Sequence, residues 1–220
     1  MSAPLVLCES VGRTFGRGQV AVVAVHAVDC AVTSASRIAL VGPSGSGKTT
    51  LLHMMAGLTS PTSGTISWPA WQGSPYGDPS RAGLVFQEAS LIPALTAAEN
   101  VAFPLQIRGA SYDQSLTEAI AALATLGLDA WSERLPEELS GGQAQRVAVA
   151  RVVASGPRLI FADEPTGRLD RAAGDRVISV LLDAADRLDA GLVVATHDAA
   201  VAARLTHTWR MHDGALEVAS

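Results

Sequence analysis

Long uninterrupted apolar runs are missing from this 220-residue sequence, although 48% of its residues are hydrophobic. The richest apolar stretch, residues 20–32, is interrupted by His26 and Asp29 and is shorter than the roughly 20 residues that a membrane-spanning helix needs. The first residues also lack the basic patch and apolar run of a secretory signal. We therefore expect a globular chain that stays in the cytoplasm and does not itself cross a membrane.

The sequence also has few cysteines and no net positive charge. Cys8 and Cys30 stand far apart and form no C-x-x-C pair, so we expect buried, reduced thiols rather than a disulfide framework. The formal net charge is −5 and the isoelectric point is about 5.5. Proteins that coat nucleic acid neutralise phosphates with clustered Lys and Arg, so this balance predicts no nucleic-acid partner.

What the sequence does contain is an alternation of short apolar runs with longer helical patterns, which favours an α/β fold with a mostly parallel core sheet. Residues 38–41, 159–162 and 192–195 lack polar alternation, as is typical of central strands covered on both faces. The Val-rich residues 5–32, with turns expected at Gly12 and at 16–18, predict antiparallel strands at one side of that sheet.

Helical signals dominate the middle of the chain. Thr96 and Glu99 have the spacing of a capping box, and the Ala- and Leu-rich residues 111–126 are followed by Gly127. A further helix is expected at 143–155 and another at 171–188. We expect one domain over residues 1–220, with a core of about 1–90 and 157–220 and a helical lobe of about 91–156. The turn-rich residues 68–79 predict a loop whose two Trp side chains either mark a contact surface or, as is more common for aromatic residues, cap a neighbouring core.

The pattern G-x-x-x-x-G-K-T occupies residues 42–49, between the strand expected at 38–41 and a helix expected at 50–56. Glycines let successive backbone N–H groups surround phosphate oxygens, and the helix N-terminus adds its positive dipole end. Lys48 is expected to hold the β- and γ-phosphates, and the Thr49 hydroxyl to ligate Mg²⁺. The residues expected at the phosphates are Gly42, Pro43, Ser44, Gly45, Ser46, Gly47, Lys48, Thr49 and Thr50.

Polar side chains also follow three of the expected strands. Asp163 and Glu164 come after the strand at 159–162, and His197 follows the one at 192–195. Gln87 lies at the end of a further strand expected at 83–86. Ligands of open α/β sheets bind beyond the carboxyl ends of the strands, so these side chains should meet the phosphate loop. Asp163 and Gln87 then suit the magnesium shell, Glu164 suits a general base, and His197 suits a hydrogen bond to the γ-phosphate.

A second helix start prepared for an anion lies later in the chain. Ser140, Gly141, Gly142 and Gln143 form a turn of mostly small residues that leads into the helix expected at 143–155. On its own, this would be an ordinary capped helix start. Two anion sites in one short chain call for an explanation.

Together these residues resemble the nucleotide-binding domains of ABC ATPases, over essentially the whole chain. Residues 42–49 resemble their Walker A motif, 159–164 their Walker B motif with its catalytic glutamate, and 140–143 their signature motif. Gln87 is similar to the Q-loop glutamine and His197 to the switch histidine. Phe15 stands where an adenine-stacking aromatic, more often Tyr, is usual. Residues 165–170 resemble the D-loop, with Arg168 where Asn or Ala is frequent.

The resemblance implies an ATPase in which ATP, with Mg²⁺, is sandwiched between the phosphate loop of one subunit and the signature helix of a second. It implies a head-to-tail homodimer or paired subunits at the cytoplasmic face of the cell membrane, with residues 88–96 and the helical lobe receiving separate permease subunits. Residues 86–101 and 162–167 are most similar to the lipoprotein-release and macrolide-export branch. A force-transmitting ATPase that regulates cell-envelope enzymes stays open, as does a soluble ABC ATPase of DNA repair or translation.

Overall fold

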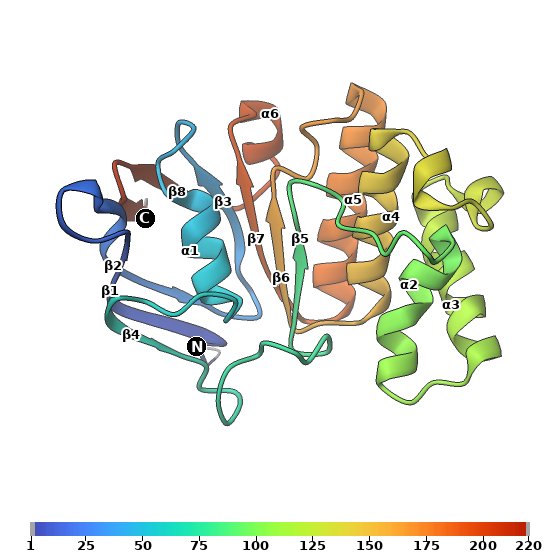
Figure 1. The fold of residues 1–220 in the computed structure, drawn as a ribbon, viewed down its shortest axis with the longest axis horizontal. Coiled ribbons are helices and arrows are strands. Elements are labelled where there is room, and N and C mark those ends of the chain that lie inside the picture. The colour runs from blue at the N-terminus through green and yellow to red at the C-terminus, as the bar shows by residue number, and fades with distance from the viewer. Residues whose placement is uncertain (1–2, 219–220) are drawn as a thin grey trace.

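The computed structural model describes residues 3–218, whose strands lie in two sheets (Figure 1). The larger sheet has six strands in the order β5-β6-β7-β3-β8-β9, and only β8 and β9 are antiparallel neighbours. This arrangement confirms the predicted α/β class with a mostly parallel core sheet. Its strands are β5 (Ala82–Val85), β6 (Leu159–Asp163), β7 (Gly191–Thr196), β3 (Arg37–Val41), β8 (His207–His212) and β9 (Ala215–Val218).

The Val-rich N-terminal strands form the predicted antiparallel unit, as a sheet of its own that packs on one face of the parallel sheet and does not join its edge. β1 (Val6–Phe15) is the central strand of this antiparallel sheet, between β2 (Val22–Val32) and β4 (Ser63–Ser67). Contrary to the prediction, Gly12 does not turn the chain: it lies within β1, where the pairing register shifts. A Cβ atom at Gly12 would collide with the Ser63 side chain of β4, which explains a glycine inside a strand.

Apart from the last, short helix, which was not predicted, the helices lie at the expected positions, with some earlier starts. They are α1 (Lys48–Met55), α2 (Ala97–Ile107), α3 (Tyr112–Thr125), α4 (Gly141–Ala154), α5 (Arg171–Arg187) and α6 (Ala199–Ala202), with short 3₁₀ turns at Gly18–Val20, Asp129–Trp131 and Pro136–Glu138. The capping box of Thr96 and Glu99 is present, and Gly127 has the positive φ expected after α3. Both α1 and α4 begin two residues earlier than predicted, because Gly47 and Ser140 act as their N-caps.

Two apolar layers cover the faces of the six-stranded sheet. In β6, Ile160 and Ala162 pack into a layer shared with α2, α3, α4 and α5, whereas Leu159 and Phe161 pack into a layer shared with α1 and the antiparallel sheet. Each successive side chain is therefore buried on the opposite face, which explains why the central strands lack polar alternation. Figure 1 shows α2 and α3 gathered at one end of the molecule, beside α4 and α5. The division into a core and a lobe at residues 91 and 156 stays a prediction.

Trp68 and the two cysteines lie at the layer shared with α1. The Trp68 ring nitrogen donates to the Met55 carbonyl oxygen over 2.9 Å, and Trp71 packs against the same layer, as expected for residues that cap a core. Cys8 and Cys30 are free, buried and directly opposite each other in β1 and β2. A hydrogen bond with Cys8, together with burial, raises the pKa of the Cys30 thiol, which keeps it protonated. Over residues 3–218, no helix has the length and apolar content required to span a bilayer.

Candidate functional site

The loop between β3 and α1 has a shape that only glycine permits at two positions. Gly47 has φ 104° and is the N-cap of α1. A Cβ atom there would collide with the Ala24 carbonyl oxygen, and one at Gly42 would collide with the Met211 carbonyl oxygen. The loop is closed by a hydrogen bond from the Ser46 N–H to the Pro43 carbonyl oxygen, 3.2 Å. Neighbouring strands therefore fix the loop in front of the N-terminus of α1, where an anion is stabilised.

Lys48, the only lysine in the 220 residues, is held inside this loop. Its side chain is largely buried, and its Nζ donates to the carbonyl oxygens of Gly42 (2.8 Å) and Pro43 (2.9 Å). An ammonium group has three donors, so one donor is left for a ligand. The hydroxyl of Ser46 is also buried and has no hydrogen-bond partner within the described residues. An anion in the loop would satisfy both groups.

Thr49 and Asp163 place two oxygen ligands side by side. The Thr49 hydroxyl donates to Asp163 Oδ2 over 2.6 Å, although the two residues are 114 positions apart. Asp163 is the last residue of β6 and is only 3% exposed. A hydroxyl and a carboxylate are oxygen ligands of the kind that Mg²⁺ prefers. This donor set fits the magnesium ion expected from the sequence.

Glu164 and His197 form the next pair along the sheet edge. His197 Nδ1 lies 2.8 Å from Glu164 Oε1, and the exposed fractions of the side chains are 72% and 14%. Glu164 has φ 45°, which is unusual for a residue other than glycine, and its N–H donates to the Ala195 carbonyl oxygen of β7, 2.9 Å. Residues with a strained backbone are often found at functional sites, where neighbouring residues hold them in place. Here β7 holds the carboxylate at the edge of the sheet.

These groups share one cavity of about 650 Å³. It collects side chains from the phosphate loop, the end of β5, the end of β6 and the end of β7, and its lining is Ala24, Ser44, Gly45, Gly47, Lys48, Thr49, Thr50, Gln87, Asp163, Glu164, Gly167, Arg168 and His197. Within the chain that the structure describes, the lining does not include Phe15 or residues 140–143. The cavity combines fixed cations, oxygen ligands for a metal ion, and a carboxylate beside an imidazole.

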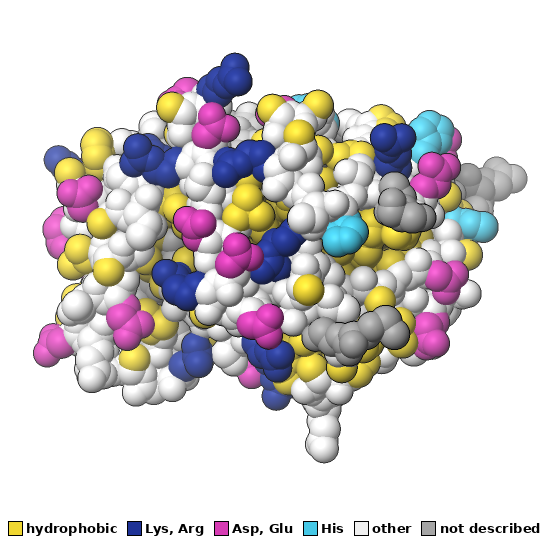
Figure 2. All heavy atoms as spheres, turned by 180° about the vertical axis from the view of Figure 1, so that it is seen from behind, with side chains coloured by type: hydrophobic (Ala, Val, Ile, Leu, Met, Phe, Trp, Pro, Cys, Tyr) yellow, Lys and Arg dark blue, Asp and Glu magenta, His cyan; other side chains and the backbone are white. Residues whose placement is uncertain are grey.

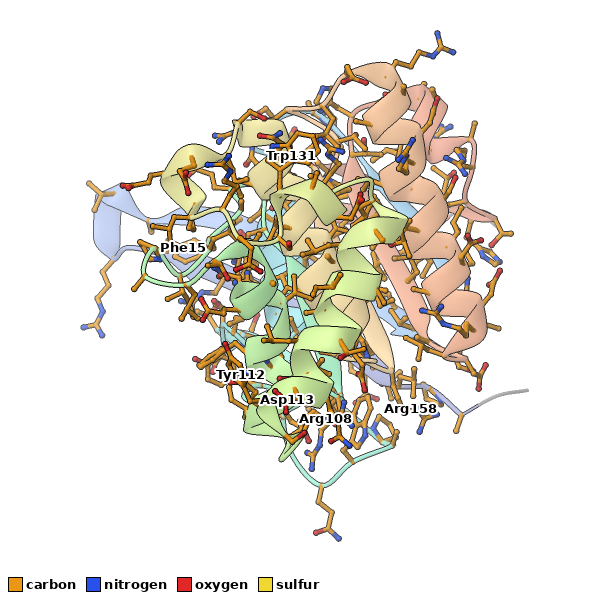
Figure 3. The ribbon with its side chains drawn as sticks, turned by 90° about the vertical axis from the view of Figure 1, so that its right-hand side faces the viewer. Phe15, Arg108, Tyr112, Asp113, Trp131 and Arg158 are labelled. Carbon is orange, nitrogen blue, oxygen red and sulfur yellow. The ribbon has the colours of Figure 1, made fainter. Side chains whose placement is uncertain are left out.

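Phe15 ends β1 at the hairpin that leads to β2, and Figure 3 places it well apart from Tyr112 and Arg158. Its side chain is 44% exposed, and the Arg13 guanidinium carbon lies 4.7 Å from the ring centre. A cation over the ring holds it by a cation–π contact. The ring is therefore a partly exposed aromatic surface at the position where the sequence predicts a residue that stacks on a base.

Residues 140–143 form a helix start with a capping box. The Ser140 hydroxyl accepts from the Gln143 N–H (3.2 Å), and Gln143 Oε1 accepts from the Ser140 N–H (2.8 Å). Gly141 is exposed, and a Cβ atom built on it would meet no atom within 4 Å. In a single chain, Gly141 in the first turn of α4 thus faces open space.

The sequence did not predict two features of this region: the role of Gln145, and the partner of Arg168 in the expected D-loop. Gln145, buried in α4, donates from Nε2 to the Phe86 carbonyl oxygen over 2.9 Å and so links α4 to the residue before Gln87. Arg168 lines the cavity and pairs with Glu88. A polar residue among the apolar positions of α4 was the available signal for Gln145, whereas nothing local pointed to Arg168 and Glu88 as partners.

The sequence profile of the family described as "ABC transporter" matches residues 25–167. This chain belongs to the ABC transporter family. Relatives named lipoprotein-releasing system ATP-binding protein LolD are similar to it along nearly their whole length. The one from Shewanella denitrificans is 40% identical, covering 98% of this chain and 95% of the relative, and the one from Legionella pneumophila (strain Paris) is 36% identical, covering 98% of each.

Solved structures of ABC transporter cassettes share the fold. A dimeric structure of the ATP-binding cassette MJ0796 in a post-hydrolysis state, bound to ADP and Pi, is 34% identical with a TM-score of 0.89, and each chain is covered to 96%. Another dimeric structure of the same cassette is 32% identical with a TM-score of 0.90 and equal coverage. These similarities confirm the resemblance drawn from the motifs. The chain is an ATP-binding, ATP-hydrolysing subunit of the ABC transporter class.

Proposed function

We propose that ATP binds with its phosphates in the cavity at the N-terminus of α1, and that two copies of the chain hydrolyse it together. The observation that carries this proposal is the convergence of Lys48, the Thr49–Asp163 pair and the Glu164–His197 pair in one cavity. The free donor of Lys48 and the free backbone N–H groups among residues 44–50 bind the β- and γ-phosphates. Thr49, Asp163 and Gln87 would hold Mg²⁺, and the ion would supply positive charge for the phosphate oxygens.

Glu164 is the proposed general base of hydrolysis. Its carboxylate accepts a proton from water as the water oxygen bonds to the γ-phosphorus, and the bond from that phosphorus to its bridging oxygen breaks, giving ADP and phosphate. His197 Nδ1 lies 2.8 Å from Glu164 Oε1, so the ring orients this carboxylate and presents Nε2 as its other polar atom. We assign Nε2 to the γ-phosphate, which places His197 between the base and the group transferred.

The second anion site explains why two copies are needed. Gly141 in the first turn of α4 faces open space in one chain, and a relative of known structure is dimeric. In our proposal, a homodimer forms head to tail, so that residues 140–143 of one copy cover the γ-phosphate bound by residues 42–49 of the other. Phe15 stacks on the adenine at the other end of the nucleotide, through its ring face. Hydrolysis removes the shared phosphate contact and lets the copies part.

We further propose that the motion drives separate membrane subunits of a lipoprotein-releasing or related export system. The support is 35–40% identity to relatives named for lipoprotein release. The chain would lie at the cytoplasmic face of the membrane, as a peripheral subunit, with residues 88–96 and the lobe of α2–α4 against its permease.

On the face seen in Figure 2, acidic and basic side chains are interspersed, without one large patch of either sign. The cargo is set by the partner subunits.

Co-purification from native membranes, followed by measurement of ATP turnover, tests this proposal. The chain should isolate with a permease that carries a large extracytoplasmic domain, and the complex should release phosphate from ATP only with a divalent cation present. Isolation with a solute-binding import system would contradict the export assignment. Absence of ATP turnover in the intact complex would contradict the site.

A further inference from the structure

Two loops of the cavity are joined by an ion pair, Arg168 with Glu88, to which the sequence motifs assign no role. β5 and β6 are parallel neighbours, so the segment after β5 and the loop after β6 leave the sheet side by side. Gln87 and Glu88 lie in the first segment, and residues 164–170 form the second. Arg168 Nη2 lies 2.7 Å from Glu88 Oε1, which bridges the two loops at the mouth of the cavity.

The same segment is anchored on its other side by α4. Gln145 donates to the Phe86 carbonyl oxygen, and Arg151 donates to that of Ser90 over 3.1 Å. Burial lowers the pKa of Arg151, yet an arginine remains charged at neutral pH. These two anchors bind backbone atoms, whereas Arg168 binds a side chain. Through Arg168, the segment that carries Gln87 is also attached to the loop that carries Glu164.

Arg168 is well placed to affect the base at Glu164. The neighbouring Gly167 N–H donates to the Glu164 carbonyl oxygen over 3.1 Å, so the backbone of this loop folds back onto the strained Glu164. A Cβ atom built on Gly142 would lie 3.4 Å from the Arg168 carbonyl oxygen, which puts the start of α4 against the same loop. A shift of Arg168 would therefore move both the proposed base, Glu164, and the start of α4, which we assign to the second ATP.

We propose that Arg168 and Glu88 form a positioning pair for ATP hydrolysis, which keeps Gln87 and Glu164 in their working arrangement at the mouth of the cavity. This inference rests on the proposed function. Both side chains are more than half exposed, at 54% and 76%. Exposed pairs contribute little free energy, so the expected effect on the rate of hydrolysis is about two- to fivefold.

A double-mutant cycle on the full-length chain tests the pair. R168M and E88Q remove the two charges with little change of shape, and R168K keeps the positive charge. We expect each neutral substitution to lower kcat for ATP about two- to fivefold, with KM within about twofold of wild type. The double variant should be no slower than the slower single variant, because the two residues act as one unit. R168K should recover most of the lost rate.

R81A is the matched control. It breaks an ion pair of Arg81 with Asp78 (2.9 Å) at the other end of β5, away from the cavity. This variant should keep kcat, and the thermal unfolding midpoints of all variants should agree with wild type. The inference would be overturned if the fold-loss of kcat in the double variant equalled the product of the two single losses. It would also be overturned if R168M raised KM while E88Q had no effect, because Arg168 would then be a phosphate ligand. Failure of the wild-type complex to hydrolyse ATP would overturn the proposed function instead.

Discussion

The N-termini of α1 and α4 are both suited to an anion, but they differ in what surrounds them. At α1, Lys48 is buried, Gly47 is enclosed by a neighbouring strand, and a cavity of about 650 Å³ lies in front. At α4, Gly141 is exposed, and the side chains of Ser140 and Gln143 accept only from each other's backbone N–H groups. The first site is built within one chain, whereas the second, in our proposal, is one wall of a site shared by two chains. The difference indicates that a second copy must supply the missing wall.

Removing the base separates binding from chemistry at the site that one chain builds. E164Q keeps the size and most contacts of the side chain but cannot accept a proton. We expect kcat for ATP to fall about 100- to 10,000-fold, while ATP affinity changes less than about threefold. Phosphate release and calorimetry measure the two quantities. Hydrolysis at a near wild-type rate would exclude Glu164 as the base.

A negative charge at the N-terminus of α4 sharpens the comparison, because it should harm only the shared site. In G141D the new side chain meets no atom in a single chain, and a carboxylate at the first turn of a helix is stabilising. We expect unchanged ATP affinity of the single chain and an unchanged unfolding midpoint. Turnover should fall about 100-fold, since a like charge beside a phosphate costs several kcal/mol. Full turnover would show that α4 does not face the nucleotide.

Removing the cation should instead weaken binding within one chain. K48A deletes the buried ammonium group that the phosphate loop holds. A hydrogen bond to a charged group contributes about 1.5–3 kcal/mol, so the Kd for ATP should rise roughly 10- to 150-fold. Calorimetry measures the change, and an unaltered Kd would contradict the assignment.

The single lysine offers an independent check of the same contact without a substitution. Amine acylation of wild-type protein, followed by mass spectrometry, reports Lys48 as the only lysine adduct. ATP should slow acylation of Lys48 while the N-terminal amine reacts at an unchanged rate. Equal labelling of Lys48 with and without ATP would contradict the position assigned to the phosphates.

The smallest expected effect compares glycine with alanine at the two helix starts. Gly47 has φ 104°, so G47A should lower the free energy of unfolding by about 1–3 kcal/mol. G141A, its matched control, should be neutral or stabilising by up to about 1 kcal/mol, because alanine favours a helix. Chemical denaturation measures both. Equal stability of the two variants would remove the structural contrast between the loops.

The parts of this fold that were predictable from sequence are those whose signal is local. The phosphate loop needs a strand, fixed glycines, a lysine and a helix within a few residues, and all of them are consecutive at 38–56. The capping box of Thr96 and Glu99 is likewise a spacing of three residues. Chains fold such segments in the same way wherever they occur, because the interactions that define them lie within one turn or one strand.

The features that were missed depend on residues that meet only in the folded chain. The third strand of the antiparallel sheet was not predicted, because β4 pairs with β1 across more than fifty residues, and Gly12 lies within β1 with Ser63 against it. The contact of Glu164 with His197 follows from the pairing of β6 with β7, and that of Arg168 with Glu88 spans 80 positions. No short spacing encodes such contacts. They arise from strand order.

The mass of the E164Q variant in solution, measured by light scattering with saturating ATP and again with ADP, tests the shared site most directly. Our account predicts the mass of two chains with ATP and of one chain with ADP, because only ATP carries the phosphate that both helix N-termini bind. A single-chain mass with ATP, at a concentration where calorimetry shows the cavity to be filled, would contradict it.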